Sequence, residues 1–357
     1  MGLPSLEPDL LYLIVLGPGY GESVLLRIPP GHWVVVDCFT VPIRARHRIN
    51  GPMEVLRQYG GQPSLLVLTH RHDDHTAGFY RLVQNSLEGC TVACVETWTS
   101  DEADLLRSLD AEALLTRGNN DQAHAAILDR WERFPGTRLP LTAQLSREIG
   151  EARITVLHPS QEFLDREAGT ASPNELSSPL LLEWRDLRIL LGADLERHWP
   201  LTADVAPDLH MHAAFKVSHH ASVNGLHPLL HGATSPDRSR LWMATPYNKN
   251  GGLPNFGSDG GPANILQHLN ELHLTALPFK HEAPNISPLR RTRKQLDDRE
   301  FPGEVLEDLP GGVRLDVIAA PDEQTGLDAW ICAGFQASGE IVSLEHGPFA
   351  VVVTEGG

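Results

Sequence analysis

Residues 69–76 read Thr-His-Arg-His-Asp-Asp-His-Thr, and five of these eight side chains are imidazoles or carboxylates. His70 and His72 are two residues apart, so from an extended backbone their side chains point the same way. Asp74 and His75 are adjacent and diverge, so they could serve a second ion. Imidazole and carboxylate ligands suit Zn²⁺, and Mn²⁺ or Fe²⁺ can take the same ligands. We therefore predict a site for two divalent metal ions, with Zn²⁺ as the first choice.

The histidine cluster directly follows a predicted strand. Ser64–Leu68 is a continuous apolar run, which is typical of a strand buried on both faces. Open α/β sheets place their ligands beyond the carboxyl ends of the strands, and this cluster lies in such a position. A helix is predicted next, at Thr76–Val83. Upstream we expect strands at Tyr12–Leu16, Ser23–Ile28 and Trp33–Asp37 and a helix at Met53–Tyr59.

The second half of the chain repeats this style. Strands are predicted at Arg153–Leu157, Pro179–Trp184, Leu187–Leu191, Ala213–Val217 and Leu241–Thr245. Apolar residues at helical spacing predict helices at Gln122–Phe134 and Ala263–Leu272. The tail from Val313 to Val353 is expected to form further short strands separated by turns.

The motif His70-x-His72-x-Asp74-His75 after a buried strand resembles the signature of the metallo-β-lactamase superfamily. The resemblance implies an α/β fold in which two βαβ-rich halves form a four-layer αββα sandwich. The metal ions would lie at the edge between the two sheets. Asp194 matches the family's bridging carboxylate, and His219 matches its last histidine. The implied metal ligands are His70, His72, Asp74, His75, Asp194 and His219.

A second motif narrows the resemblance to one branch. His219-His220-Ala221-Ser222 is similar to the His-His-Gly-Ser motif of competence DNA-uptake proteins and of teichoic-acid phosphorylcholine esterases. Asn174-Glu175-Leu176-Ser177 resembles the Asn-x-x-Ser segment of the same branch. Asn174, Ser177, Ser222 and Asn224 are therefore candidates for substrate contact, although Ser222 and Asn224 could equally cap a helix.

The resemblance covers roughly residues 10–280. We expect residues 1–280 to form the hydrolase domain. Residues 281–357 are expected to form a C-terminal extension with short strands that packs on the same domain.

Two assignments stay open at the level of sequence. Most superfamily members have a further metal-binding histidine before the bridging aspartate, and His158 is the nearest candidate. In the similar branch that position is not usually a ligand. Either His219 or His220 could be the last ligand. We favour His219, with His220 beside it as a group that contacts a phosphoryl oxygen, protonates the leaving group, or only packs.

The expected reaction is hydrolysis by a metal-bound hydroxide. A catalytic zinc ion lowers the pKa of bound water to about 7, and two ions can share one carboxylate. Asp194 is the candidate for that shared carboxylate. Asp74 could orient the hydroxide as well as bind metal, so Asp74 and His220 are the candidate catalytic residues.

A phosphodiester is the substrate that suits such a pair of cations best, so a phosphodiesterase or nuclease is predicted. The formal net charge of −17 argues against a broad basic surface that grips nucleic acid unaided. A partner protein could supply that affinity, and the resemblance extends to effectors of bacterial antiphage defence. The alternatives are a hydrolase of lactones, thioesters or other small esters, and a non-catalytic scaffold that retains the fold.

The N-terminal region predicts a cytoplasmic protein. The apolar stretch Leu10–Leu16 has no basic region before it and is too short to span a membrane. The four cysteines, Cys38, Cys90, Cys94 and Cys332, are too few for a disulfide framework in so long a chain. We expect no membrane association, and the sequence does not determine an oligomeric state.

Overall fold

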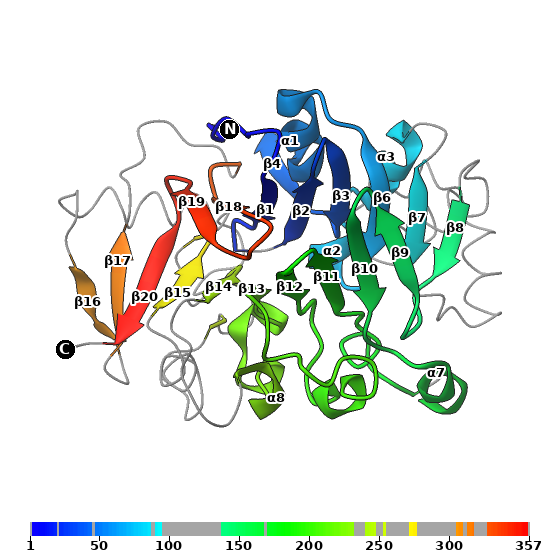
Figure 1. Cartoon of the computed structure of the whole chain (residues 1–357). Coiled ribbons are helices and arrows are strands. Elements are labelled where there is room, and N and C mark those ends of the chain that lie inside the picture. The colour runs from blue at the N-terminus through cyan, green and yellow to red at the C-terminus, as the bar shows by residue number, and fades with distance from the viewer. Residues whose placement is uncertain are drawn as a thin grey trace.

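Two large β-sheets lie face to face at the centre of the protein, as seen in a computed structural model of the chain (Figure 1). The residues that the structure describes are 2–19, 21–44, 47–86, 90–94, 137–167, 170–231, 240–247, 253–254, 271–276, 305–309, 313–317 and 327–355.

The first sheet has the strand order β19-β18-β1-β2-β3-β6-β7-β8 within the described residues. Neighbours from β19 to β3 are antiparallel, whereas β3, β6, β7 and β8 are parallel. The strands are β1 (Leu11–Leu16), β2 (Ser23–Ile28), β3 (His32–Val36), β6 (Pro63–Leu68), β7 (Thr91–Cys94), β8 (Thr137–Pro140), β18 (Trp330–Phe335) and β19 (Ile341–His346).

The second sheet has the order β16-β17-β20-β15-β14-β13-β12-β11-β10-β9 within the same residues. It repeats the plan of the first, because the antiparallel strands β10 to β12 lead into the parallel strands β13 to β15. Its strands are β9 (Ser146–Ile149), β10 (Ala152–Val156), β11 (Leu180–Trp184), β12 (Leu187–Leu191), β13 (Ala214–Lys216), β14 (Leu241–Ala244), β15 (Glu271–Leu274), β16 (Val305–Leu309), β17 (Val313–Val317) and β20 (Val351–Glu355).

Helices cover the outer face of each sheet, which gives the four layers of an αββα sandwich (Figure 1). On the first sheet lie α1 (Gly51–Tyr59) and α3 (Phe79–Asn85), close to the short α2 (Asp73–Thr76). On the second lie the 3-10 helix η1 (Trp199–Thr202) and α8 (Pro228–His231). The remaining helices are α7 (Gln161–Glu167) and the 3-10 turns η2 (His219–Ala221) and η3 (Val223–Gly225). The predicted fold class is confirmed.

The apolar runs of the sequence are continuous because their strands are buried on both faces. In β1, Leu13 belongs to the core between the two sheets, whereas its neighbour Ile14 faces the core under α1 and α3. In β12, Ile189 faces the central core and Leu190 faces the core under η1 and α8. Successive side chains of a strand point to opposite faces, so a strand inside a sandwich needs apolar residues at every position.

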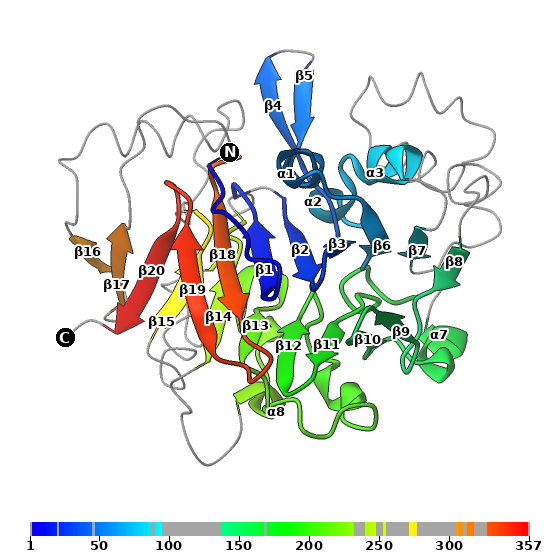
Figure 2. The same cartoon turned by 45° about the horizontal axis from the view of Figure 1, so that its top comes forward.

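A hairpin of β4 (Thr40–Arg44) and β5 (His47–Asn50) projects from the first sheet beside α1 (Figure 2). Its last residue, Asn50, caps α1 by accepting a hydrogen bond from the Met53 N–H at 3.1 Å. The single helix predicted at Thr76–Val83 is wrong in detail. The chain forms α2 and α3 instead, because Gly78 adopts a left-handed φ of 92° between them.

Most predicted elements are confirmed to within one or two residues, including all nine predicted strands up to Thr245. The predicted helix Gln122–Phe134 lies outside the described residues, as does Ala263–Leu272 up to position 270. The end of the second prediction is wrong, because Leu272 lies in the strand β15 and not in a helix.

The predicted C-terminal extension contributes strands to both sheets. β18 pairs with β1, and β20 pairs with β15. The proposed boundary near residue 280 stays a prediction. In the part of the chain that the structure describes, no helix has the length and apolar character needed to cross a membrane. All four cysteines are buried as free thiols.

Candidate metal centre

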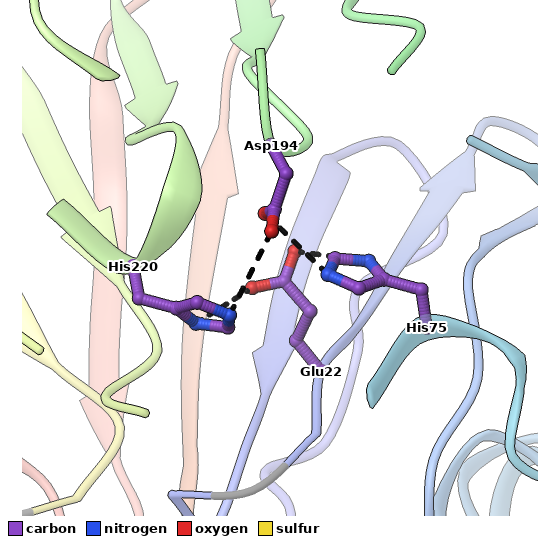
Figure 3. Close-up of side chains that lie close together, drawn as sticks. All are labelled: Glu22, His75, Asp194 and His220. Carbon is purple, nitrogen blue, oxygen red and sulfur yellow. Dashed lines mark ion pairs between the residues drawn. The ribbon is translucent and has the colours of Figure 1, made fainter. Parts of the chain in front are cut away.

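The histidines and aspartates of the predicted site meet where strands of both sheets end. His70 and His72 follow β6, and Asp74 and His75 lie in α2. Asp194 lies three residues beyond β12, on the second sheet. Figure 3 shows Asp194 pointing down between His75 and His220. Residues more than a hundred positions apart in the chain are thereby brought together.

One group of possible ligands consists of His70, His72 and Asp194. The Nε2 atom of His70 lies 3.2 Å from Nδ1 of His72 and 3.7 Å from Oδ2 of Asp194. His70 and Asp194 are buried, and His72 is partly buried. These separations allow one cation to contact all three side chains.

A second group consists of Glu22, His75, Asp194 and His220, and Asp74 lies against it. Oδ2 of Asp74 lies 3.1 Å from Nε2 of His220 and 3.8 Å from Nε2 of His75. The Asp194 oxygens lie 3.4 Å from Nε2 of His75 and 4.0 Å from Nε2 of His220. Asp194 therefore takes part in both groups, as expected for a carboxylate that bridges two ions.

Two buried atoms of this cluster show that its residues fit a metal ion. Nε2 of His75 and Oδ1 of Asp194 are inaccessible to solvent and make no hydrogen bond among the described residues, and the two atoms lie 3.4 Å from each other. Buried polar atoms almost always have a partner, because leaving one unsatisfied is costly. A divalent cation that accepts both lone pairs would satisfy these atoms, and nitrogen and carboxylate donors suit Zn²⁺, Mn²⁺ or Fe²⁺.

The electrostatics of the cluster also favour a cation. Burial opposes a positive charge on His75, but Asp194 and Asp37 outweigh it and hold the pKa of His75 well above its ordinary value. Burial likewise opposes the charge of Asp194, yet His75 and His220 hold the pKa of that carboxyl well below its usual range. Burial and the neighbouring His75 lower the pKa of His70. The carboxylates thus stay ionised and attract positive charge.

Asp37 orients His75 from behind. Its Oδ2 lies 2.8 Å from Nδ1 of His75 and accepts the hydroxyl of Thr69, and its Oδ1 accepts the Thr69 N–H at 2.8 Å. An Nδ1–H bonded to Asp37 leaves Nε2 as the nitrogen that faces Asp194 and could bind a metal ion. Metal-binding histidines are commonly fixed in this way. The sequence analysis did not single out Asp37, although it ends the predicted strand Trp33–Asp37.

Ser177 supports the ligands rather than facing solvent. It is fully buried, its hydroxyl accepts the Asp194 N–H at 2.9 Å, and it lies 3.3 Å from Nδ1 of His70. The sequence analysis placed Ser177 among substrate contacts. The structure places its hydroxyl between protein groups, where it steadies one ligand from each sheet.

The adjacent histidines of η2 point in different directions. His220 is 1% exposed, and its Nδ1 lies 3.0 Å from the Thr245 carbonyl oxygen, so Nε2 faces Asp74. The His219 side chain is 22% exposed, and its Nδ1 lies 3.1 Å from Oε1 of Glu196. The structure therefore brings His220 into the ligand cluster and leaves His219 at its outer rim, which is the reverse of the assignment favoured from the sequence.

The other candidates occupy the rim or lie apart. Asn174 donates to Glu196 at 2.9 Å, and its Nδ2 lies 3.3 Å from Nε2 of His219. Ser222 caps η3 by accepting the Gly225 N–H, and Asn224 is exposed.

His158 lies in none of the ligand groups found among the described residues. Its Nε2 lies 2.8 Å from the carbonyl oxygen of Glu175, and its ring stacks on His198. Burial lowers the pKa of His158 to about 4, so the ring is neutral near pH 7.

Glu22 and Lys216 are functional candidates that the sequence analysis missed. Glu22 is buried and lies beside His75 and His220 (Figure 3). Its side chain accepts hydrogen bonds from the Lys216 ammonium and the Thr245 hydroxyl. A lysine inside an apolar strand was the available signal, because a buried lysine is almost always paired.

Residues 16–86 match the family described as the Metallo-beta-lactamase superfamily. No curated protein matches the chain. The match contains the first four predicted ligands and supports the superfamily expected from the sequence. With the αββα architecture, it identifies the metallo-β-lactamase fold. The match does not reach the His-His segment, so the predicted branch stays a prediction.

Several solved structures resemble the chain at a distance. They include a protein of unknown function from Enterococcus faecalis, with 11% identity over 58% of this chain and 49% of that one, and a TM-score of 0.32. The metallo-beta-lactamase fold protein YhfI from Bacillus subtilis has 12% identity over 58% and 70%, with a TM-score of 0.33. CmlA, a diiron beta-hydroxylase from Streptomyces venezuelae, has 17% identity over 60% and 35%, with a TM-score of 0.33. The chain spans about half the length of the first of these proteins. Sequence identities and TM-scores as low as these carry no information on activity.

Proposed function

We propose that this protein is a binuclear metal-dependent hydrolase of phosphodiesters. The observation that carries the proposal is the buried cluster of imidazoles and carboxylates at the junction of the two sheets, in which Nε2 of His75 and Oδ1 of Asp194 lie 3.4 Å apart and make no hydrogen bond with the described residues. His70, His72 and Asp194 would hold one ion, and Asp74, His75, Asp194 and His220 would hold the other. Bound divalent ions lower the pKa of water to about 7, which supplies a nucleophile at neutral pH.

The residues at the rim suit the handling of substrate. His219 is partly exposed and is held by Glu196, so it can deliver a proton to a leaving group. This role replaces the one first given to His220, because His220 is 1% exposed whereas the side chain of His219 is 22% exposed. Asp74 keeps a role in orienting the attacking water, since its Oδ2 lies 3.1 Å from Nε2 of His220 and 3.8 Å from Nε2 of His75.

A cavity of about 500 Å³ lies next to this rim and could receive the rest of the substrate. Glu175 and Arg197 line it, and each is the chain neighbour of a rim residue, Asn174 or Glu196. Arg166 and His198 also line it. The two arginines are matched by Glu167 and Glu175, so attraction for a negatively charged substrate such as a phosphodiester would come from the pair of cations.

Nucleic acid is the more specific substrate that we propose, which would make the protein a nuclease. The net charge of −17 is unfavourable for unaided binding of nucleic acid, so a partner protein would supply that affinity. A place among bacterial defence effectors would be consistent with such a partner. The support for both is the similarity of His219-His220-Ala221-Ser222 to the His-His-Gly-Ser motif.

The test is hydrolysis of bis-p-nitrophenyl phosphate, DNA and RNA, compared with a panel of lactones and thioesters, after loading with zinc or manganese. We expect phosphodiester turnover that Asp74→Ala abolishes and that the exposed control Asp186→Asn retains. Turnover of lactones or thioesters alone would replace the proposal with the small-ester alternative. Tight metal binding without any turnover would indicate a scaffold.

A further inference from the structure

Glu22 connects the two sheets at the metal centre. It lies one residue before β2 and is 2% exposed. Its backbone N–H donates to the carbonyl oxygen of Asp74 at 2.9 Å. Its side chain reaches the other sheet, where one oxygen accepts from Lys216, the last residue of β13, and the other from Thr245, directly after β14. Glu22 thus binds the Asp74 segment of the first sheet and the ends of β13 and β14 in the second sheet.

Thr245 passes this constraint to His220. The carbonyl and hydroxyl oxygens of Thr245 lie 3.0 and 3.1 Å from Nδ1 of His220. Because the Thr245 hydroxyl donates its proton to Glu22, its oxygen can only accept from the imidazole. Nδ1 of His220 must therefore carry a proton, so Nε2 is the ring nitrogen that faces Asp74 and is left for a metal ion.

Glu22 lies close enough to His75, Asp194 and His220 to be counted with them, but both of its oxygens already accept hydrogen bonds, from Lys216 and Thr245. Its oxygens are 3.8 Å from Nδ1 of His75 and 3.5 Å from Nδ1 of His220. Those two nitrogens are the ones bonded to Asp37 and Thr245. Asp194 instead approaches the Nε2 atoms of both rings, and Figure 3 shows the two carboxylates converging between His75 and His220.

We infer that Glu22 is a positioning residue, which aligns the ligands of the second sheet with those of the first through Lys216 and Thr245. The inference rests on the proposed metal centre. Lys216 is 1% exposed and forms an ion pair with Glu22, so the pair adds little net charge beside the metal ions. Removing either member leaves an uncompensated buried charge, whereas removing both does not.

The test measures zinc affinity of the full chain by competition with a chromophoric chelator, and the visible spectrum of the Co²⁺-substituted protein. Groups that orient metal ligands typically contribute 10–100-fold to metal affinity. We expect Glu22→Gln and Lys216→Met each to lower the affinity for one of the two ions by that factor and to change the Co²⁺ spectrum. The double variant should regain most of the affinity. Glu151→Gln, which removes half of an exposed ion pair with Arg185, is the matched control and should change neither readout.

A second pair of variants tests the hydrogen bonds that Thr245 forms with Glu22 and His220, and it leaves the buried charges unchanged. Thr245→Val should lose affinity and alter the spectrum, and Thr245→Ser, which keeps the hydroxyl, should restore both. Wild-type affinity and spectrum in folded Glu22→Gln and Thr245→Val would overturn the inference while leaving the metal centre intact. Unchanged affinity in Lys216→Met, with no recovery in the double variant, would show that Glu22 is itself a ligand and would also overturn it. A wild-type chain that takes up no ion would refute the proposed function and the inference together.

Discussion

Replacing Asp37 by asparagine tests how His75 is prepared for a metal ion. The substitution keeps the shape of the side chain but exchanges one acceptor oxygen for an amide donor. If the amide faces His75, Nδ1 must accept, so the ring proton moves to Nε2, the atom 3.4 Å from Asp194. If it faces Thr69 instead, it meets the backbone N–H that Asp37 now accepts at 2.8 Å. One orientation removes His75 as a ligand, and the other places two buried donors against each other.

The size of the effect follows from these contacts. Loss of a group that orients a ligand lowers metal affinity by about 10–100-fold, or about 1.4–2.8 kcal/mol. The stability of the metal-free protein should change less. Each bond from Thr69 weakens by about 1 kcal/mol when its acceptor loses its charge. Burial, the largest influence, raises the pKa of Asp37 even though its partners lower it, so the ionised carboxylate is costly in the fold and its removal offsets that loss.

The assay compares zinc binding, by chelator competition, with urea unfolding of the metal-free protein. Asp37→Asn should lose affinity for one ion and remain within about 1–2 kcal/mol of the wild type in unfolding free energy. Asp186→Asn, in the exposed turn between β11 and β12, is the control and should alter neither. Wild-type affinity for both ions in Asp37→Asn would refute the assignment of Nε2 of His75 as a ligand atom.

Three further predictions concern other parts of the molecule. His220→Gln should leave one metal ion per chain where the wild type has two, whereas His219→Gln should retain both, as measured by elemental analysis; the opposite pattern would restore the sequence-based assignment. Burial lowers the pKa of His212 from 6.5 to about 4, so the unfolded chain takes up its proton first. The unfolding free energy of the metal-free protein should therefore fall between pH 6.5 and 4, by up to about 3 kcal/mol for this residue, and urea titrations of His212→Gln should show a smaller fall. Gly192→Ala would place a methyl group 2.8 Å from a backbone nitrogen, so it should cost about 1–3 kcal/mol in urea unfolding, while Gly31→Ala, with open space around it in the described structure, should be nearly neutral.

The strands and the first ligand segment could be predicted because their signals are local. Ser64–Leu68 is apolar at every position, and the structure buries its last four residues in β6 between two cores. The ligands that follow it are neighbours in the chain, so their spacing alone indicates a metal site. The break between α2 and α3 is also local, but it depends on the left-handed φ of Gly78, which a helical pattern does not reveal.

The supporting residues could not be paired in advance because their partners are distant in the chain. Lys216 stands out as a charged residue in the apolar strand Ala213–Val217, so a buried partner could be expected. Glu22 is 194 positions away, and nothing in its own segment distinguishes it from an exposed glutamate. Only the packing of the two sheets brings β13 and the start of β2 together.

The choice between His219 and His220 depends on backbone conformation rather than on residue type. Both are histidines at the end of the same strand, so the motif favours neither. In the structure, His219, His220 and Ala221 have φ values of 46°, 53° and 58°, a left-handed conformation that such residues rarely adopt. The turn is held by a hydrogen bond from the His219 N–H to the Ala193 carbonyl oxygen, directly before Asp194. Strained backbone of this kind persists only where the surrounding structure enforces it, and it is concentrated at functional sites. The turn that directs His220 inward is therefore anchored beside Asp194, the ligand that both metal groups share. Because this anchor joins two segments that are distant in the chain, the sequence around His219 and His220 does not reveal which of them points inward.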